Sequence, residues 1–96
     1  MDIEKIVEGD TVTLGLKGWL DTQAAPELAA VLDEIGSDIS SIVFEFKELE
    51  YISSAGIRQI VLAYKKMSGN ITLKSVSGEV FEVLNMTGIT KKVNIE

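Results

Sequence analysis

The chain has 96 residues, the size of one compact domain, and no stretch rich in Pro, Gly or Ser divides it. Hydrophobic residues make up 46% and charged residues 25%, a balance typical of a globular protein with a real core. Cysteine and histidine are absent, which excludes disulfides, thiolate and Ser-His-Asp catalysis and most transition-metal sites. The net charge of −6 opposes nucleic-acid binding, because phosphate backbones are bound largely through Lys and Arg. We therefore expect a single domain over residues 1–96 that does not bind nucleic acid. Its acidity suits a basic or neutral protein partner, but keeping soluble proteins apart is the more common role of such a charge.

Two features bear on the location of the chain. The longest apolar runs, such as Ile42–Phe44, span a few residues, whereas a membrane-spanning helix needs about 20. The start, Met1–Lys5, lacks the basic stretch and apolar block of a secretory signal. We expect no membrane insertion and a cytoplasmic location.

A β-hairpin is predicted at the start of the chain. Apolar residues alternate with other residues over Val12–Leu16, which is the period of a strand with one buried face. A shorter segment with apolar residues, Ile3–Val7, precedes it, and Glu8–Asp10 between the two supplies turn residues.

A helix is predicted next. Four apolar residues between Leu28 and Ile35 recur at i, i+3, i+4 and i+7, which marks one face of a helix. Pro26 must fall in the first turn, because proline lacks the N–H that is needed deeper in a helix. The helix should therefore begin within Thr22–Ala25 and end near Gly36.

The middle of the chain predicts a central strand and a second helix. Ser41–Phe46 is rich in β-branched and aromatic residues, which favours a strand covered on both faces. A polar bend at Lys47–Glu48 should end this strand. Ser54–Met67 has helical spacing of its apolar residues, with two lysines in its last turn and Gly69 just beyond, as is typical of a helix C-terminus.

The remaining residues predict a strand over Ile71–Leu73, a helix that opens at Ser77–Glu79 and ends before Gly88, and a brief strand at Val93–Ile95. The order is ββαβαβαβ. Strands that alternate with helices favour parallel pairing, so we expect an α/β domain with a mixed, mostly parallel sheet, the hairpin as its antiparallel edge and three helices.

The junction Glu50–Arg58 is the most informative stretch, because two serines lie where the second helix begins. The first N–H groups of a helix have no internal partners and carry partial positive charge, so a hydroxyl caps them and an anion is stabilised there. Ser54 suits a plain cap, which is the usual role of a serine before a helix, and the same position would also accept a phosphate. Gly56 would let a partner or a phosphate approach the backbone closely.

Two motifs in register, Gly18–Asp21 and Ser53–Ile57, resemble the STAS domain family. The resemblance extends over essentially the whole chain, including Ala25–Leu28 and Val83–Gly88. In the bacterial anti-sigma factor antagonists of this family, an Asp-Ser-Ser/Thr-Gly-Leu motif carries a serine that is phosphorylated by a partner acting as both anti-sigma factor and kinase. Alignment of the glycines implies that this serine is Ser54, with Ser53 as the second candidate.

The resemblance implies a cycle of binding and release. The unphosphorylated module captures the anti-sigma factor, phosphorylation releases it, and a serine phosphatase restores binding. The module itself catalyses nothing and needs no metal or cofactor.

The chain departs from the family pattern in four ways. Ser53 occupies the usual Asp position, Ala55 replaces the second hydroxyl residue, and Trp19 stands where the family often has a charged residue. Family members also often carry one more C-terminal helix, so we expect a smaller partner surface here.

Three of the predicted partner-binding residues also have a simpler structural interpretation. Asp21 matches an acidic residue that the family places near the phosphorylation site, but it also suits a helix cap. Trp19 would contact a partner if exposed and pack in the core if buried. Arg58 suits either an acidic group of a partner or a solvated helix face. The full predicted set is Trp19, Asp21, Ser53, Ser54, Gly56, Ile57 and Arg58.

Three hypotheses follow. The first is an anti-sigma factor antagonist whose helix over 54–64 docks on an anti-sigma factor or related serine kinase. The second is a constitutive STAS subunit of a transporter or sensory complex, motivated by the departures at Ser53 and Ala55. The third is small-ligand or nucleotide binding at the helix N-terminus, although the phosphate-loop pattern Gly-x-x-x-x-Gly-Lys-Ser/Thr is absent. An intrinsic enzyme ranks last, and the sequence does not determine the oligomeric state.

Overall fold

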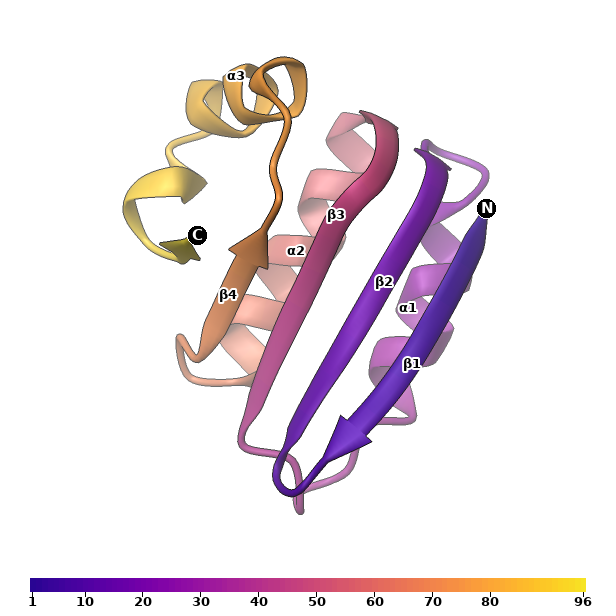
Figure 1. Cartoon of the computed structure of the whole chain (residues 1–96), viewed down its shortest axis with the longest axis vertical. Helices are drawn as coiled ribbons and strands as arrows, with labels where there is room; N and C mark the ends of the chain where they lie inside the picture. The colour runs from indigo at the N-terminus through magenta and orange to yellow at the C-terminus, as the bar shows by residue number, and fades with distance from the viewer.

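A five-stranded sheet organises the fold, and the computed structural model describes all 96 residues. The strands lie side by side in the order of the chain: β1 (Asp2–Glu8), β2 (Thr11–Leu20), β3 (Ser41–Ile52), β4 (Ile71–Lys74) and β5 (Asn94–Ile95) (Figure 1). β1 pairs antiparallel with β2, and every other pair is parallel. The predicted element order and the mixed sheet with a hairpin edge are confirmed.

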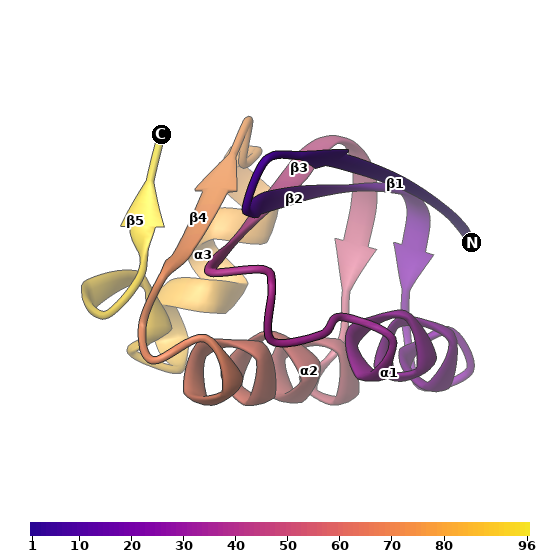
Figure 2. The ribbon, with the colours of Figure 1, turned by 90° about the horizontal axis from the view of Figure 1, so that it is seen from below.

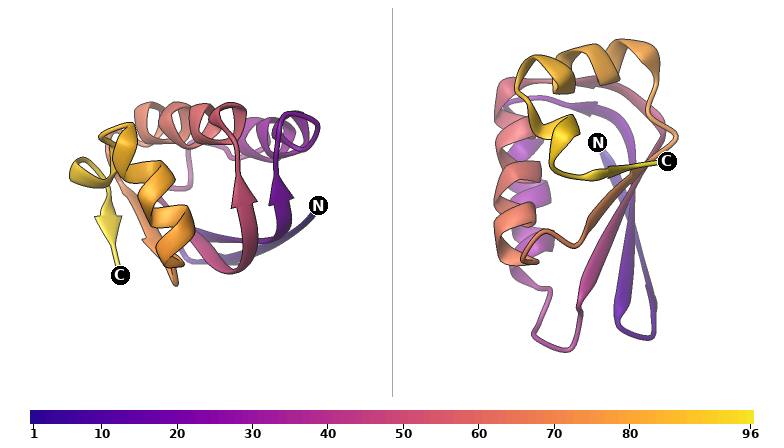
Figure 3. Two further views of the ribbon diagram at one scale, coloured as in Figure 1. Left: turned by 90° about the horizontal axis from the view of Figure 1, so that it is seen from above. Right: turned by 90° about the vertical axis from the view of Figure 1, so that its left-hand side faces the viewer.

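Two helices cover one face of the sheet, and a third lies at its end. α1 (Ala25–Asp33) and α2 (Ser54–Lys66) run side by side on the same face (Figure 2). α3 (Gly78–Met86) crosses beyond the carboxyl end of β4 and leads into a short 3₁₀ helix, η1 (Ile89–Lys91) (Figure 3). The three predicted helices are confirmed, and η1 was not predicted. None of these helices is long and apolar enough to cross a membrane.

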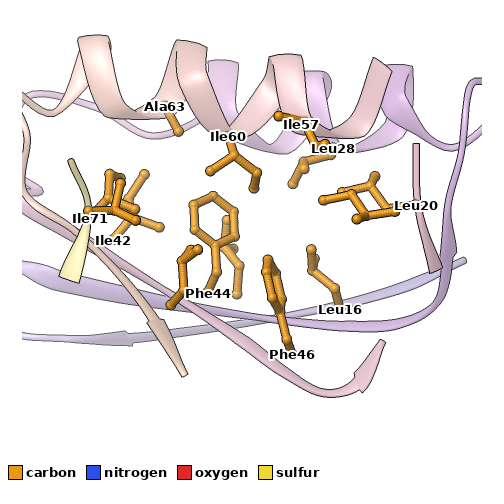
Figure 4. Packing of buried hydrophobic residues seen from close by; sticks show 14 of the residues in the cluster. Leu16, Leu20, Leu28, Ile42, Phe44, Phe46, Ile57, Ile60, Ala63 and Ile71 are labelled. Atoms are coloured by element: carbon orange, nitrogen blue, oxygen red, sulfur yellow. The ribbon is translucent and has the colours of Figure 1, made fainter. Parts of the chain in front are cut away.

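The core lies between the sheet and the two covering helices. Alternate residues of β2 and of β3 as far as Phe46 point toward α1 and α2, where these side chains meet the apolar stripes of both helices. The result is one cluster of 23 buried hydrophobic residues. The members labelled in Figure 4 are Leu16, Leu20, Leu28, Ile42, Phe44, Phe46, Ile57, Ile60, Ala63 and Ile71.

β3 differs from its prediction in two respects. It continues through the expected bend at Lys47–Glu48 as far as Ile52, because its pairing with β2 shifts register twice and so accommodates the polar residues. It is also covered on one face only. Ile42 and Phe44 are fully buried, whereas Val43 between them is half-buried, since both covering helices lie on the same side.

A lysine joins the two covering helices. The Lys66 ammonium, in the last turn of α2, donates a hydrogen bond of 2.6 Å to the carbonyl oxygen of Leu32 near the end of α1. A cation at this position also complements the negative end of each helix dipole. The contact fixes α1 beside α2 at the end of the molecule opposite the predicted motifs.

Candidate functional site

The two motifs predicted from the sequence meet at one end of the sheet. β2 and β3 are parallel neighbours that end together, with Leu20 paired to Ile52, and each leads directly into a covering helix. The Ser53 N–H donates to the Leu20 carbonyl oxygen at 2.9 Å. Ser53 therefore lies beside the strand end that leads into Asp21, at the carboxyl edge where ligands and partners of parallel sheets often bind.

Ser53, and not Ser54, caps α2. The Ser53 hydroxyl accepts a hydrogen bond of 3.3 Å from the Gly56 N–H, and its backbone is extended, with φ −98° and ψ 172°. The prediction of Ser54 as the capping hydroxyl is wrong by one residue, because β3 continues to Ile52 and the helix begins directly after Ser53. Ser54 is instead the first helical residue and is exposed to solvent.

Gly56 and Ile57 are structural residues. A Cβ at Gly56 would lie 2.6 Å from Leu20 Cγ and 2.7 Å from the Leu20 carbonyl oxygen. The expectation that Gly56 leaves room for a partner is therefore corrected: its missing side chain lets α2 approach the end of β2. Ile57 is 5% exposed and belongs to the core, so its side chain is not available to a partner in this structure.

Asp21 organises the turn before α1. One oxygen of its carboxylate, Oδ1, accepts hydrogen bonds from the N–H groups of Gln23 at 3.1 Å and Ala24 at 2.9 Å. α1 has no side-chain cap of its own, because Ala24 occupies the N-cap position and Pro26 lies in the first turn. Asp21 therefore does accept hydrogen bonds from backbone N–H groups, as a cap would, but it closes the turn before α1 and does not occupy the N-cap position itself.

A shallow groove separates the first turns of α1 and α2. Small side chains keep it open, with Ala25 and Ala29 on the α1 side and Ala55 on the α2 side. Ser54 and Arg58, one helical turn apart, stand together along the α2 side. The remaining lining residues are Thr22, Pro26 and Gln59.

Arg58 carries an uncommitted positive charge. It is exposed, and the two ion pairs of the structure, Lys17–Glu48 and Lys74–Glu96, do not involve it. Arg58 is therefore free to meet an anion in the groove, whether that anion belongs to a partner or to a modified Ser54.

Trp19 is exposed and pairs with an aromatic residue that the sequence pattern did not reveal. The rings of Trp19 and Tyr51 lie 5.2 Å apart between centroids and are tilted by 42°. The two residues are register partners on β2 and β3, and their neighbours Leu20 and Ile52 are buried against the helices. Alternation along a strand thus places both rings on the opposite face of the sheet. Tyr51 precedes the buried Ile52, so alternation would place it on the exposed face. That inference requires knowing that β3 extends to Ile52, which the sequence pattern did not indicate.

The predicted residues consequently divide into three groups. Ser54, Arg58 and Trp19 are exposed, and Asp21 and Ser53 are half-buried and hold the turns around them. Gly56 and Ile57 lie inside. The structure contains no group of three or more acidic side chains arranged to hold a metal ion.

Comparison with known proteins places the chain in a family. The model of the STAS domain family matches residues 2–96, and the chain belongs to this family.

Solved structures share the fold over nearly the whole chain. An anti-sigma factor antagonist from Mycobacterium paratuberculosis matches with a TM-score of 0.82 at 18% identity, covering 98% of this chain and 85% of that one. The anti-sigma factor antagonist SpoIIAA in its unphosphorylated form matches with a TM-score of 0.79 at 17% identity, covering 99% and 87%. Its phosphorylated form, from Bacillus, matches with a TM-score of 0.69 at 16% identity, covering 99% and 91%.

A protein of another kind shares the fold as well. A sulfate transporter family protein from Wolinella succinogenes matches with a TM-score of 0.75 at 19% identity, covering 91% of this chain and 74% of that one. At such low identities these likenesses establish a shared architecture alone.

Proposed function

We propose that the chain is an anti-sigma factor antagonist, a protein-binding module that captures an anti-sigma factor/serine kinase and is released when Ser54 is phosphorylated. The observation that carries the proposal is that two adjacent serines have different structural roles. Ser53 holds the cap of α2, and Ser54 presents a free position at the first residue of the same helix.

The fold tolerates a phosphate on Ser54. The group would add about −1.5 to −2 charges beside the positive end of the α2 dipole, where anions are stabilised. Arg58 lies one turn further along and has no competing carboxylate. Because the cap is made by Ser53, modification of Ser54 would leave the hydrogen bond to Gly56 in place.

A partner seated on the groove would reject the same phosphate. Arg58 is the only charged side chain in the lining of the groove, so a partner that fills the groove would bury Ser54 among mostly uncharged groups. A doubly charged group would have to be desolvated there or matched by added cations. Phosphorylation would then lower affinity strongly without a change of fold.

The departure at Ser53 fits this interpretation. The family motif has Asp at that position, and the position is the N-cap of α2 in this structure. Ser and Asp are about equally good N-caps. The substitution therefore preserves the local structure that presents Ser54, and Ala55 forms part of the groove wall.

The likeness to SpoIIAA supports the proposal, because that protein is an anti-sigma factor antagonist that exists in unphosphorylated and phosphorylated forms. By this analogy the phosphate would be placed by the captured kinase and removed by a separate serine phosphatase. The module would act by binding, with no catalysis of its own.

The experiment combines site mapping with capture. The protein is incubated with the cognate kinase and ATP, and the phosphate is located by mass spectrometry, where we expect Ser54 and not Ser53. Capture of the kinase is then compared for wild type, Ser54→Ala and Ser54→Asp. The matched control is Ser37→Asp, which adds the same charge at an exposed serine in the loop after α1. Capture that is unchanged by Ser54→Asp would contradict the proposal.

A second candidate is a constitutive STAS subunit of a transporter. The likeness to the Wolinella sulfate transporter family protein favours it. The departures at Ser53 and Ala55 also favour it, because they remove the motif's carboxylate and second hydroxyl, which a kinase would contact, even though they keep the local structure. The same groove would then dock permanently. A pull-down that recovers a membrane transporter and no serine kinase would select this function over the first.

A further inference from the structure

The Trp19–Tyr51 pair is an exposed aromatic surface that the proposed phosphorylation site does not use. Trp19 is 58% exposed and Tyr51 is 44% exposed, although both belong to long central strands. Isolated exposed apolar residues are common, but two large aromatic rings in mutual contact form a patch of the kind enriched in binding hot spots.

Carboxylates gather beside this pair. Trp19 borders a shallow depression between the start of β1, the end of β2 and the first turn of α1. Its lining includes four carboxylates against two positive groups, the amino group of Met1 and Lys17. Lys17 is turned toward Glu48 outside the depression, at 3.8 Å. The four carboxylates are those of Asp2, Asp21, Glu27 and Glu50.

Aromatic faces and carboxylates together select one chemistry. A guanidinium group stacks on the face of an indole ring and pairs with a carboxylate at its edge, whereas an acidic or neutral segment would gain neither contact. The net charge of −6 adds long-range attraction for a basic partner.

We propose that the Trp19–Tyr51 pair and the neighbouring Glu27 and Glu50 form a docking surface for a basic segment of the partner protein, with an arginine side chain stacked on Trp19. The surface and the groove at Ser54 lie at the same end of the sheet, where β2 and β3 lead into α1 and α2. The inference rests on the proposed function only for the identity of that partner.

The test uses a defined probe in place of the partner. Because Trp19 is the only tryptophan, its fluorescence reports occupancy of this surface directly. We expect acetylated tetra-arginine amide to change Trp19 emission saturably at low ionic strength, tetra-lysine to bind more weakly, and tetra-glutamate to leave the emission unchanged. Failure of tetra-arginine to bind saturably, or equal binding of tetra-glutamate, would overturn the inference.

Variants locate the site by amide-shift NMR titration, which does not need the tryptophan. Trp19→Ala should weaken tetra-arginine binding about 2- to 5-fold, the loss of one exposed cation–π contact. Glu50→Gln should weaken it by more than the control Glu34→Gln, which removes the same charge at the opposite end of α1. Equal losses for the two Gln variants would show attraction by net charge alone and would overturn the inference, as would unchanged binding by Trp19→Ala.

The peptide experiment needs neither kinase nor phosphate, so its outcome separates from that of the proposed function. If peptide binding depends on Trp19 but Ser54→Asp leaves capture of the kinase unchanged, the docking surface is supported and the phosphorylation switch is contradicted. If Ser54→Asp abolishes capture but peptide binding does not depend on Trp19, the switch is supported and the docking surface is contradicted.

Discussion

Helices α2 and α3 begin with the same cap but differ in the residue after it. Ser53 accepts a hydrogen bond from the Gly56 N–H at 3.3 Å, and Ser77 accepts one from the Val80 N–H at 3.3 Å. The next residue is Ser54 in α2 and Gly78 in α3. A capping serine is therefore ordinary in this chain, and the distinctive feature of α2 is the second hydroxyl beside the groove.

The two helices also differ three residues after the cap. Val80 fills that position in α3 with a buried side chain, whereas Gly56 leaves it empty in α2 because the end of β2 is too close. The start of α2 therefore packs closely against the end of β2, and this contact fixes the position of Ser54. Substitutions at the two helix starts test this difference.

The largest expected effect belongs to Gly56→Ala. The added methyl would contact the backbone oxygen of Leu20, which cannot rotate away, so the free energy of unfolding should fall by about 1–3 kcal/mol, as in overpacked cores. Gly78→Ala is the matched control, since a Cβ there meets nothing within 4 Å. It should raise stability, by up to about 1 kcal/mol. Urea denaturation measures both, and a neutral Gly56→Ala would contradict the tight contact.

Removal of the caps should have the next largest effect. Ser53→Ala and Ser77→Ala should each lower the free energy of unfolding by about 0.5–2 kcal/mol, because each leaves a helix N–H without its partner. Ser53→Asp should retain the cap and the stability. Ser54→Ala should change thermal and urea unfolding by a few tenths of a kcal/mol at most. If Ser54→Ala lowered the free energy of unfolding as much as Ser53→Ala does, Ser54 and not Ser53 would be the capping residue.

A smaller effect is expected from charge at the first residue of α2. Ser54→Asp should stabilise the protein by about 0.3–1 kcal/mol at low salt, because the carboxylate meets the positive end of the helix dipole. Ser54→Asn is the uncharged control of similar size. Unfolding measured at low and high salt should show the gain for Asp alone and its loss on screening. A destabilising Ser54→Asp would contradict the claim that the fold tolerates phosphate.

The smallest expected effect is the coupling between positions 54 and 58. A double-mutant cycle with Ser54→Asp and Arg58→Gln should give a favourable interaction of about 0.3–0.5 kcal/mol, typical of an exposed pair at i, i+4 with the acid first. The cycle is measured by urea unfolding at low salt. An interaction energy of zero at low salt would show that Arg58 does not interact with the negative charge at position 54.

Periodicity predicted most of the fold because each element carries a full apolar face. The helices over Leu28–Ile35 and Ser54–Met67 were found from spacing alone, and their ends were marked by Pro26 and Gly69. Gly69 has φ +91°, as expected of a glycine after a helix. η1 was missed because a three-residue turn has no repeating pattern to find.

The site was predicted less well because it depends on where β3 ends. Lys47 and Glu48 interrupt the apolar alternation, and only the register shifts against β2 carry the strand past them to Ile52. That extension moves the cap from Ser54 to Ser53 and places Tyr51 beside Trp19. The close approach of Leu20 to Gly56 is likewise a tertiary contact without a local signal.

The order of the strands has a consequence for how the chain reaches its native state. Each strand pairs only with its neighbours in sequence, and the widest closure, between β2 and β3, joins residues such as Thr11 and Ser41. Loop closure is entropically easier over short separations, and pairing each strand with its neighbour in sequence avoids any closure longer than the one between β2 and β3. The sheet can therefore grow one strand at a time from the hairpin onward, including during synthesis from the N-terminus. The groove at Ser54 needs only α1, α2 and the strand ends before them, so it can form before β5 is added at the far edge.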